Sequence, residues 1–424
     1  MNRDPANTLC DAIRRGNATA LRQLLLDDPL ARGCINDAIG PFGGRPLTMA
    51  MQFDVVEALL DFGADPNLPS DWSEGGFVPL DGKDEQTAKL LLERGATLTP
   101  HAAAAHGWLD ELRNLLDRDA MLVHQKGGDG TRPLHWAKDA SVVDFLLDRL
   151  ADVDARCTDH LSTPLQYLVK ASPAAAKRLL ERGATTDIFT SAALGDTVRL
   201  AEELHRSPQL LSQRIGDAGY NRAAEHTVLQ WTLGHRKLVY VVARENGQPE
   251  AADLVLDLAT PAQRLISHAA AGEIDQAQPY QSEVTSLSQE SHGGLAIAVF
   301  FGQTTVAEAM IELGFDPAAP GIDGGNALHA VAWVGHAGLL QKLLTLPAIA
   351  SIVNEADPTH GSTPLGWALL GSHMRNAPGG DYAACVRLLK AAGASTGLQG
   401  NAAGRSLESM AGGRADVLPV LRER

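Results

Sequence analysis

Apolar residues in this chain fall at helical spacing and end at a recurring signal. Val55, Val56, Leu59 and Leu60 place an apolar stripe on one face of a predicted helix. A Gly-Ala pair follows, and a glycine there suits the left-handed residue that ends a helix. The pattern therefore predicts a series of helices that end alike. The same paired leucines with a later Gly-Ala occur at Leu59-Leu60 with Gly63, Leu91-Leu92 with Gly95, Leu179-Leu180 with Gly183, and Leu388-Leu389 with Gly393.

A second signal precedes these helices. Pro46 and Pro79 each stand before a leucine and lie 33 residues apart, as do Leu295 and Leu328. Proline favours the first position of a helix, where its missing N–H has no partner to lose. The chain is therefore predicted to repeat a two-helix unit with a period near 33 residues. The starts are Arg45-Pro46-Leu47, Val78-Pro79-Leu80, Arg132-Pro133-Leu134, Thr163-Pro164-Leu165, Asn326-Ala327-Leu328 and Thr363-Pro364-Leu365.

This unit resembles the ankyrin repeat, which has a β-turn finger, an inner helix starting Thr-Pro-Leu-His and an outer helix ending Leu-Leu-x-x-Gly-Ala. The resemblance covers about residues 7–395 and about 11–12 repeats. It implies an all-α repeat solenoid with short β-turn fingers. Several segments together look like one group of bacterial ankyrin-repeat proteins. They are STPLQYLV (162–169), TDIFTSAALGD (186–196), VLQWTLGHRKLVYVVARENG (228–247), ALHAVAWVGH (327–336) and GSTPLGWALLGSH (361–373).

The repeats differ in length along the chain. From the motif leucine to the second paired leucine there are 12 or 13 residues after Leu47, Leu80 and Leu134, which predicts inner helices clipped by about one turn. The distance is 24 residues after Leu365 and about 25–27 after Leu229, so two repeats are enlarged by insertions. We therefore expect clipped N-terminal repeats in residues 1–188, repeats with insertions in residues 189–395, and a helical cap in residues 396–424, all in one continuous solenoid.

Size and charge limit the possible partners. A chain of 424 residues exceeds what one central core normally supports, which favours a solenoid. Its net charge of −15, without a block of lysine or arginine, argues against nucleic acid as a partner. Its longest apolar runs are far shorter than the ~20 residues that span a bilayer, so we expect no membrane insertion. The four scattered cysteines and the absence of an apolar leader indicate a cytoplasmic protein.

Aromatic residues gather at one position of the repeat. Two residues after the motif leucine, on the inner helix and facing the concave side, stand Trp136, Tyr167, Trp231 and Trp367. Trp333 lies one helical turn further along its own inner helix. Aromatic faces in a row can stack on a ligand or receive side chains of a partner. The competing interpretation is that these rings fill the space between neighbouring repeats.

Titratable residues occupy the predicted finger tips. Five residues before the motif leucine stand Asp129, His160, Asp323 and His360. Acid–base groups are therefore available in the enlarged C-terminal half, although acidic residues are also ordinary in tight turns. No pair of ligand-type residues has the helical spacing of a metalloprotease, so neither a metal site nor a cofactor is expected. We add His226, His235 and His373, near the two insertions, to the candidates.

Other histidines have a structural explanation. His135 and His329 directly follow motif leucines, where ankyrin histidines bond between neighbouring repeats. The leading functional prediction is a recognition protein that binds a protein or a small ligand in its concave groove, because ankyrin arrays more often present surfaces than perform chemistry. One alternative is a cofactor-independent acid–base enzyme, a hydrolase, lyase or isomerase, with its pocket in the C-terminal half. Another is an immunity protein that neutralises a toxin.

Overall fold

The chain is all-helical over the residues that the computed structural model describes, which are 4–217, 227–397 and 400–423. No β-strand occurs among the elements in these ranges. The described residues form two compact units. Unit 1 comprises Met1–Arg206, Gln213–Arg236 and Asn246–Gln248 as far as they are described, and unit 2 comprises Ser207–Ser212, Lys237–Glu245 and Pro249–Arg424.

Unit 1 holds the first fourteen α-helices and four short 3-10 segments. The α-helices are α1 (Pro5–Arg15), α2 (Ala18–Asp27), α3 (Pro29–Gly33), α4 (Pro46–Met49), α5 (Phe53–Asp61), α6 (Glu85–Glu93), α7 (Pro100–His106), α8 (Leu109–Arg118), α9 (Ala140–Asp148), α10 (Pro164–Ala171), α11 (Pro173–Glu181), α12 (Ile188–Leu194), α13 (Thr197–Arg206) and α14 (Leu229–Thr232). The 3-10 segments are η1 (Pro41–Gly43), η2 (Ala120–His124), η3 (Gly128–Gly130) and η4 (Pro133–Trp136).

Unit 2 holds the remaining elements. Its α-helices are α15 (Val239–Glu245), α16 (Pro249–Leu258), α17 (Pro261–Ala271), α18 (Ile274–Ala277), α19 (Gln289–His292), α20 (Gly294–Phe300), α21 (Thr304–Leu313), α22 (Ala327–Val334), α23 (Ala337–Leu344), α24 (Pro364–Met374), α25 (Tyr382–Ala391), α26 (Leu407–Met410) and α27 (Leu418–Arg422). Its 3-10 segments are η5 (Pro208–Ser212), η6 (Gln278–Ser286), η7 (Ile322–Gly324) and η8 (Pro347–Ser351).

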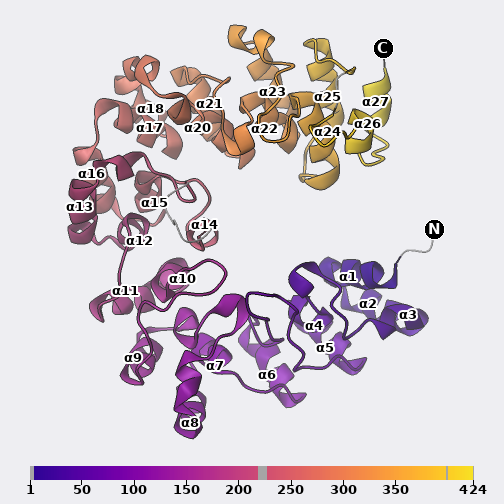
Figure 1. Ribbon diagram of the computed structural model, residues 1–424, viewed down its shortest axis with the longest axis vertical. Helices are drawn as coiled ribbons and strands as arrows, with labels where there is room; N and C mark the ends of the chain where they lie inside the picture. The colour runs from indigo at the N-terminus through magenta and orange to yellow at the C-terminus, as the bar shows by residue number, and fades with distance from the viewer. Residues whose placement is uncertain (1–3, 218–226, 398–399, 424) are drawn as a thin grey trace. The chain divides into compact units, whose positions relative to one another are not determined.

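The helices of unit 2 pack in two rows. α20, α22 and α24 lie side by side in one row, and each packs on the helix that follows it in the chain, α21, α23 or α25 (Figure 1). The row helices are apolar almost all round, since Leu328 and Val331 of α22 face one neighbour and the next turn faces another. α26 and α27 pack on α24 and α25. The core of unit 2 is therefore continuous from α17 to α27.

The first helices of the predicted repeats in unit 1 are short, as the leucine spacing predicts. α4 has 4 residues, η4 is a single 3-10 turn of 4 residues, and the chain after Pro79 forms only turns. The equivalent helix α22 has 8 residues. Clipping α4 leaves the carbonyls of Thr48 and Ala50 without a following turn. The buried Lys83 Nζ donates to both, at 3.3 and 2.6 Å.

A tight turn precedes several of these helices. Phe42, Asp129 and Asp323 all have positive φ values, of 56, 56 and 53°, and a glycine with positive φ follows each of them. In the turn of Asp129, Gly127 N donates to Thr131 O at 2.9 Å and Thr131 N donates to Gly128 O at 3.1 Å, which closes it like a two-residue hairpin. Two successive left-handed residues thus turn the side chain at the tip outward.

Side chains tie each helix pair to the next through backbone groups. Asn36 accepts from Asp65 N at 2.8 Å and donates to Gly63 O at 3.2 Å, and Asn67 and Asn354 repeat this arrangement with the next Gly-Ala end. His135 and His329 lie within 3.2 and 3.0 Å of the carbonyls of Ser162 and Ser362 through Nε2. The structural role predicted for these two histidines is confirmed.

The two enlarged repeats use their extra residues differently. α24 runs on for 11 residues to Met374 before a loop leads to α25. That loop packs down, because Ala377 N donates to Tyr382 Oη at 3.1 Å and Asp381 N donates to Gly335 O at 2.9 Å. After α14 the extra chain includes another helix, α15, which packs on α16. None of the described helices has both the length and the apolar character needed to cross a bilayer.

Candidate functional site

The predicted site residues fall into separate groups, which are described for each unit by itself. His160, Tyr167 and Trp231 line one cleft in unit 1, and Trp136 lines a second pocket there. Asp323, Trp333, His360 and Trp367 line a cleft in unit 2. The repeat register thus brought together residues that are 30 to 70 positions apart in the sequence.

The Trp231 cleft of unit 1 has a volume of about 700 Å³. Aromatic rings form most of its wall, and two of them are largely exposed, Phe42 at 67% and Trp231 at 57%. The rings of His160 and Trp231 meet edge to face, with centroids 4.8 Å apart. The cleft is defined by Phe42, Trp72, Phe77, Asp129, Asp159, His160, Tyr167, Val228, Gln230 and Trp231.

Polar groups converge at the floor of the Trp231 cleft. His160 Nδ1 lies 3.2 Å from Asp159 Oδ2 and 3.5 Å from Tyr167 Oη. Burial raises the pKa of Tyr167 far above its usual value, so this hydroxyl stays protonated and acts as a hydrogen-bond donor. Trp72 Nε1 donates to Asp129 Oδ1 at 3.0 Å. The hydroxyl and the indole N–H therefore hold the carboxylate and imidazole groups in place.

Three of these groups are potential metal ligands. One ligand atom from each of Asp129, Asp159 and His160 lies within 4.8 Å of the others. We expected no metal site, because no local spacing of ligand residues stands out in the sequence. The cluster escaped that search since Asp129 comes from one turn and Asp159 and His160 come from the next turn along the chain.

The Trp333 cleft of unit 2 is smaller, at about 400 Å³. Phe300 and Trp333 lie parallel with centroids 6.4 Å apart, and Trp367 meets Trp333 edge to face at 6.1 Å. At the rim, His360 Nε2 lies 3.6 Å from Asp323 Oδ2. Trp333 Nε1 is buried and has no hydrogen-bond acceptor among the described residues. The cleft is defined by Phe300, Asp323, Trp333, His360, Ser362, Trp367, Leu370, Asn401, Ala403, Arg405 and Met410.

Trp367 is anchored in the wall of the Trp333 cleft and is only 6% exposed. Its Nε1 donates to Asp357 Oδ2 at 2.9 Å, and Ser362 N donates to the same oxygen at 3.0 Å. Burial alone would raise the pKa of Asp357, but these and further hydrogen bonds hold it below the ordinary value. Asp357 is therefore an ionised structural acceptor that fixes the turn and the indole together.

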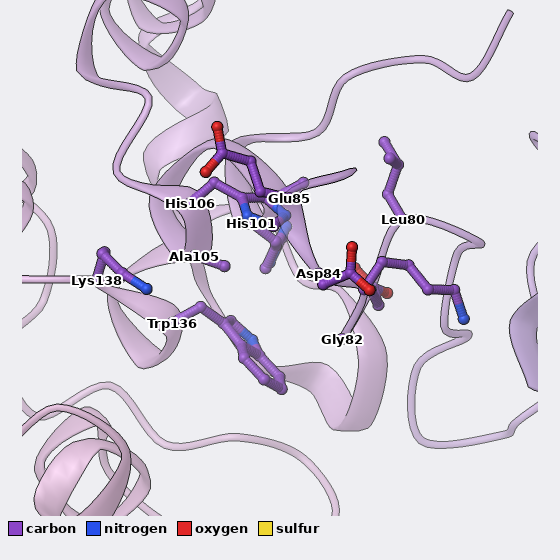
Figure 2. A pocket seen from close by; sticks show the side chains of 12 residues that line it. Leu80, Gly82, Asp84, Glu85, His101, Ala105, His106, Trp136 and Lys138 are labelled. Atoms are coloured by element: carbon purple, nitrogen blue, oxygen red, sulfur yellow. The ribbon is translucent and has the colours of Figure 1, made fainter. Parts of the chain in front are cut away.

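The Lys83 pocket of unit 1 is more polar, with a volume of about 350 Å³. In Figure 2, Trp136 and Lys138 lie on one side of it, and Asp84 and Leu80 lie on the other. Burial lowers the pKa of Lys83 to about 8. Because Lys83 already binds backbone carbonyls, this pocket has a structural explanation. We define it by Leu80, Asp81, Gly82, Lys83, Asp84, Glu85, His101, Ala102, Ala105, His106, Trp136 and Lys138.

The remaining predicted histidines lie apart from the cleft walls or outside the described residues. His235 is exposed beside the Trp231 cleft, with its ring centroid 5.6 Å from that of Trp231. His373 is exposed near the end of α24, and its ring lies against Gly412 and does not line the Trp333 cleft. His226 lies outside the described residues.

Several lining residues were not among the candidates. Trp72 and Phe77 come from the long segment between α5 and α6, which has no place in the repeat register. Phe300 and Arg405 come from the end of one helix and from the segment before α26. Phe42 stands at the same finger-tip position as His160 and Asp323, so extending the tip register to apolar residues would have found it.

Comparison with known proteins gives one partial similarity. No model of a protein family matches the chain. A stretch of 73 residues is 40% identical to Protein PhlB of Serratia liquefaciens. The match covers 17% of this chain and 31% of PhlB, so the chain spans about a third of the length of this curated relative. A similarity over so little of either protein assigns no family.

Proposed function

We propose that this chain is an ankyrin-type repeat protein that binds a protein partner at the Trp231 cleft. Three kinds of periodic feature support the ankyrin assignment: the two-residue turns at Phe42, Asp129 and Asp323, the histidine bonds to the next repeat, and the asparagine bonds at the Gly-Ala ends. Each recurs at the register of the sequence repeat. Turns of this kind would be the fingers of the predicted solenoid.

The exposed aromatics carry the proposal of a protein partner. Trp231 and Phe42 expose more than half of their surface around one cleft, whereas large apolar side chains of folded proteins are mostly covered. Tryptophan dominates the binding energy of many protein interfaces, because it buries a large area at low cost in side-chain entropy. A toxin that the chain neutralises would be one partner of this kind.

Site-specific crosslinking tests this proposal. A photoreactive phenylalanine analogue placed at Trp231 or Phe42 should crosslink one and the same protein in extracts of the source organism. The analogue at Val198, which is 68% exposed on α13, serves as the matched control. Calorimetry with the purified partner should then show weaker binding for Trp231→Ala. Equal crosslinking from position 198, or an unchanged affinity in Trp231→Ala, would contradict the proposal.

A small ligand in the Trp333 cleft is the second candidate, supported by the unsatisfied Trp333 Nε1 in a compact aromatic wall. An acceptor atom on a flat ligand would satisfy this donor. The acid–base enzyme alternative would use the His360 and Asp323 pair at the rim of the same cleft. Ligands found by thermal shift should lose binding in Met410→Trp, which fills the cleft, and turnover of any of them should be lost in His360→Gln.

A further inference from the structure

We propose that Asp129, Asp159 and His160 bind one divalent transition-metal ion of the zinc class at the floor of the Trp231 cleft. The three side chains offer two carboxylate oxygens and one imidazole nitrogen within 4.8 Å of one another. These are ligand atoms that Zn²⁺ accepts. This site goes beyond the proposed partner binding and stands on different observations.

The backbone holds the two contributing turns together at the ligands themselves. Thr158 N and Asp159 N both donate to Asp129 O, at 2.9 and 3.2 Å. Asp129 has a φ of 56°, which turns its side chain away from its own turn and toward the following one. The distance between the two carboxylates is therefore set by main-chain hydrogen bonds and does not depend on flexible side chains alone.

The ligand spacing fits a small ion. His160 Nδ1 and Asp159 Oδ2 are 3.2 Å apart. Two ligand atoms on a tetrahedral centre with bonds of about 2.1 Å lie about 3.4 Å apart, so these two atoms need almost no movement to share an ion. Asp129 completes the set after a small rotation of its carboxylate. His160 is only 8% exposed, so its ring is already fixed in the wall of the cleft.

Neighbouring groups orient the ligands, as is usual around metal ions. Trp72 Nε1 donates to Asp129 Oδ1 at 3.0 Å, which leaves the second oxygen of that carboxylate to face the ion. Tyr167 Oη lies 3.5 Å from His160 Nδ1 and can donate to a carboxylate of the loaded site. Each ligand would then keep an oriented partner.

The number and type of ligands select the ion. Ca²⁺ takes six to eight oxygen ligands, and Mg²⁺ favours oxygen and water, whereas three ligands that include an imidazole suit Zn²⁺. Two carboxylates balance the charge of a divalent ion. All three ligands line the cleft, so the fourth position opens into it and can take an oxygen atom of whatever occupies the cleft.

Zinc titration of the full chain tests the proposal. After treatment with a chelator and dialysis, the protein should bind one equivalent of ZnCl₂ by calorimetry and retain it on desalting, as measured by elemental analysis. Asp129→Asn and Asp159→Asn should each weaken binding by at least about tenfold, since each removes a charged ligand. Co²⁺ in the same site should give the intense visible absorption of tetrahedral coordination, and both variants should reduce it.

Asp323→Asn is the matched control. Asp323 occupies the same turn position in unit 2, with φ of 53° and a histidine at 3.6 Å, but it has no second carboxylate in such a cluster among the described residues. This variant should bind zinc like the wild type. Circular dichroism should show that all three variants are folded. The proposal is overturned if the folded wild type binds no zinc at micromolar concentration, or if both unit 1 variants bind it with unchanged affinity.

Discussion

His135 and His329 show how buried polar residues of this chain serve the backbone. Nδ1 of His135 accepts from Arg132 N at 3.1 Å, so the proton of the neutral ring lies on Nε2, which donates to Ser162 O. His329 repeats this geometry with Asn326 N and Ser362 O. Burial lowers the pKa of both imidazoles to about 4. Only the neutral ring, with its proton on one particular nitrogen, therefore fits at each position.

We expect the free energy of unfolding to fall as the pH is lowered from about 7 toward 4. In that window an unfolded histidine, with a pKa near 6.5, takes up a proton that the folded ring with a pKa of about 4 does not. Each of the two residues contributes at most about 1.4 kcal/mol per pH unit. Urea denaturation at pH 7 and pH 5 measures this loss.

The matched variant for this pH dependence is the double substitution His135→Gln and His329→Gln. It should be less stable than the wild type at pH 7, because glutamine restores the bonds imperfectly, but it should lose less stability between pH 7 and pH 5. An identical loss in both proteins would show that the two imidazoles do not cause the pH dependence.

At the scale of single helices, the same position of the repeat gives different environments. Trp231 of α14 and Trp367 of α24 both stand two residues after a motif leucine, yet one is 57% exposed and the other 6%. The difference lies outside the helices. Trp367 is covered because Asp357, in the preceding turn, supplies a buried acceptor for its indole N–H. The register predicts which way each ring points but not what covers it.

We therefore expect opposite outcomes from two alanine substitutions. Trp367→Ala should cost about 3–5 kcal/mol of stability, because it opens a cavity and leaves Asp357 with one donor fewer. Trp231→Ala should change stability by about 1 kcal/mol at most, since most of the side chain is already in solvent. Chemical denaturation followed by circular dichroism compares them. Equal losses would mean that exposure does not separate a structural ring from a binding ring.

The sequence predicts the regular parts of this fold and misses what depends on unique packing. Helix ends, the clipped helices α4 and η4, and the bridging histidines follow from local patterns, because each is set by neighbours within one repeat. The grouping of candidates in clefts followed from the register. Trp72 and Phe77 could not be predicted, since they reach the Trp231 cleft from a segment outside the repeat. The acidic cluster with His160 arises only where two turns meet.

For the whole molecule, packing is local along the chain. The helices of unit 2 contact mainly the elements before and after them, and no described helix of that unit is surrounded by a central core. Stability in such an arrangement is close to a sum of terms for each repeat and its nearest neighbours. A destabilised helix should therefore open together with its neighbours and leave distant helices closed.

Leu343→Ala tests this locality. Leu343 is fully buried in α23, so the substitution should cost about 2–5 kcal/mol. Hydrogen exchange read by mass spectrometry should rise in α22, α23 and α25, which pack together, and stay unchanged in α5 and α9 of unit 1. Faster exchange across the whole chain would indicate one cooperative core, and no loss of stability would show that α23 is misplaced.

The bonds that join successive repeats end on main-chain atoms. His135, His329 and Asn36 reach the carbonyls of Ser162, Ser362 and Gly63, which any amino acid would provide at the same place. A neighbouring repeat can then change nearly all of its side chains in evolution without breaking the join. Repeats of this chain should be open to duplication and exchange one at a time, and the aromatic and acidic residues of the clefts are free to diverge while the scaffold persists.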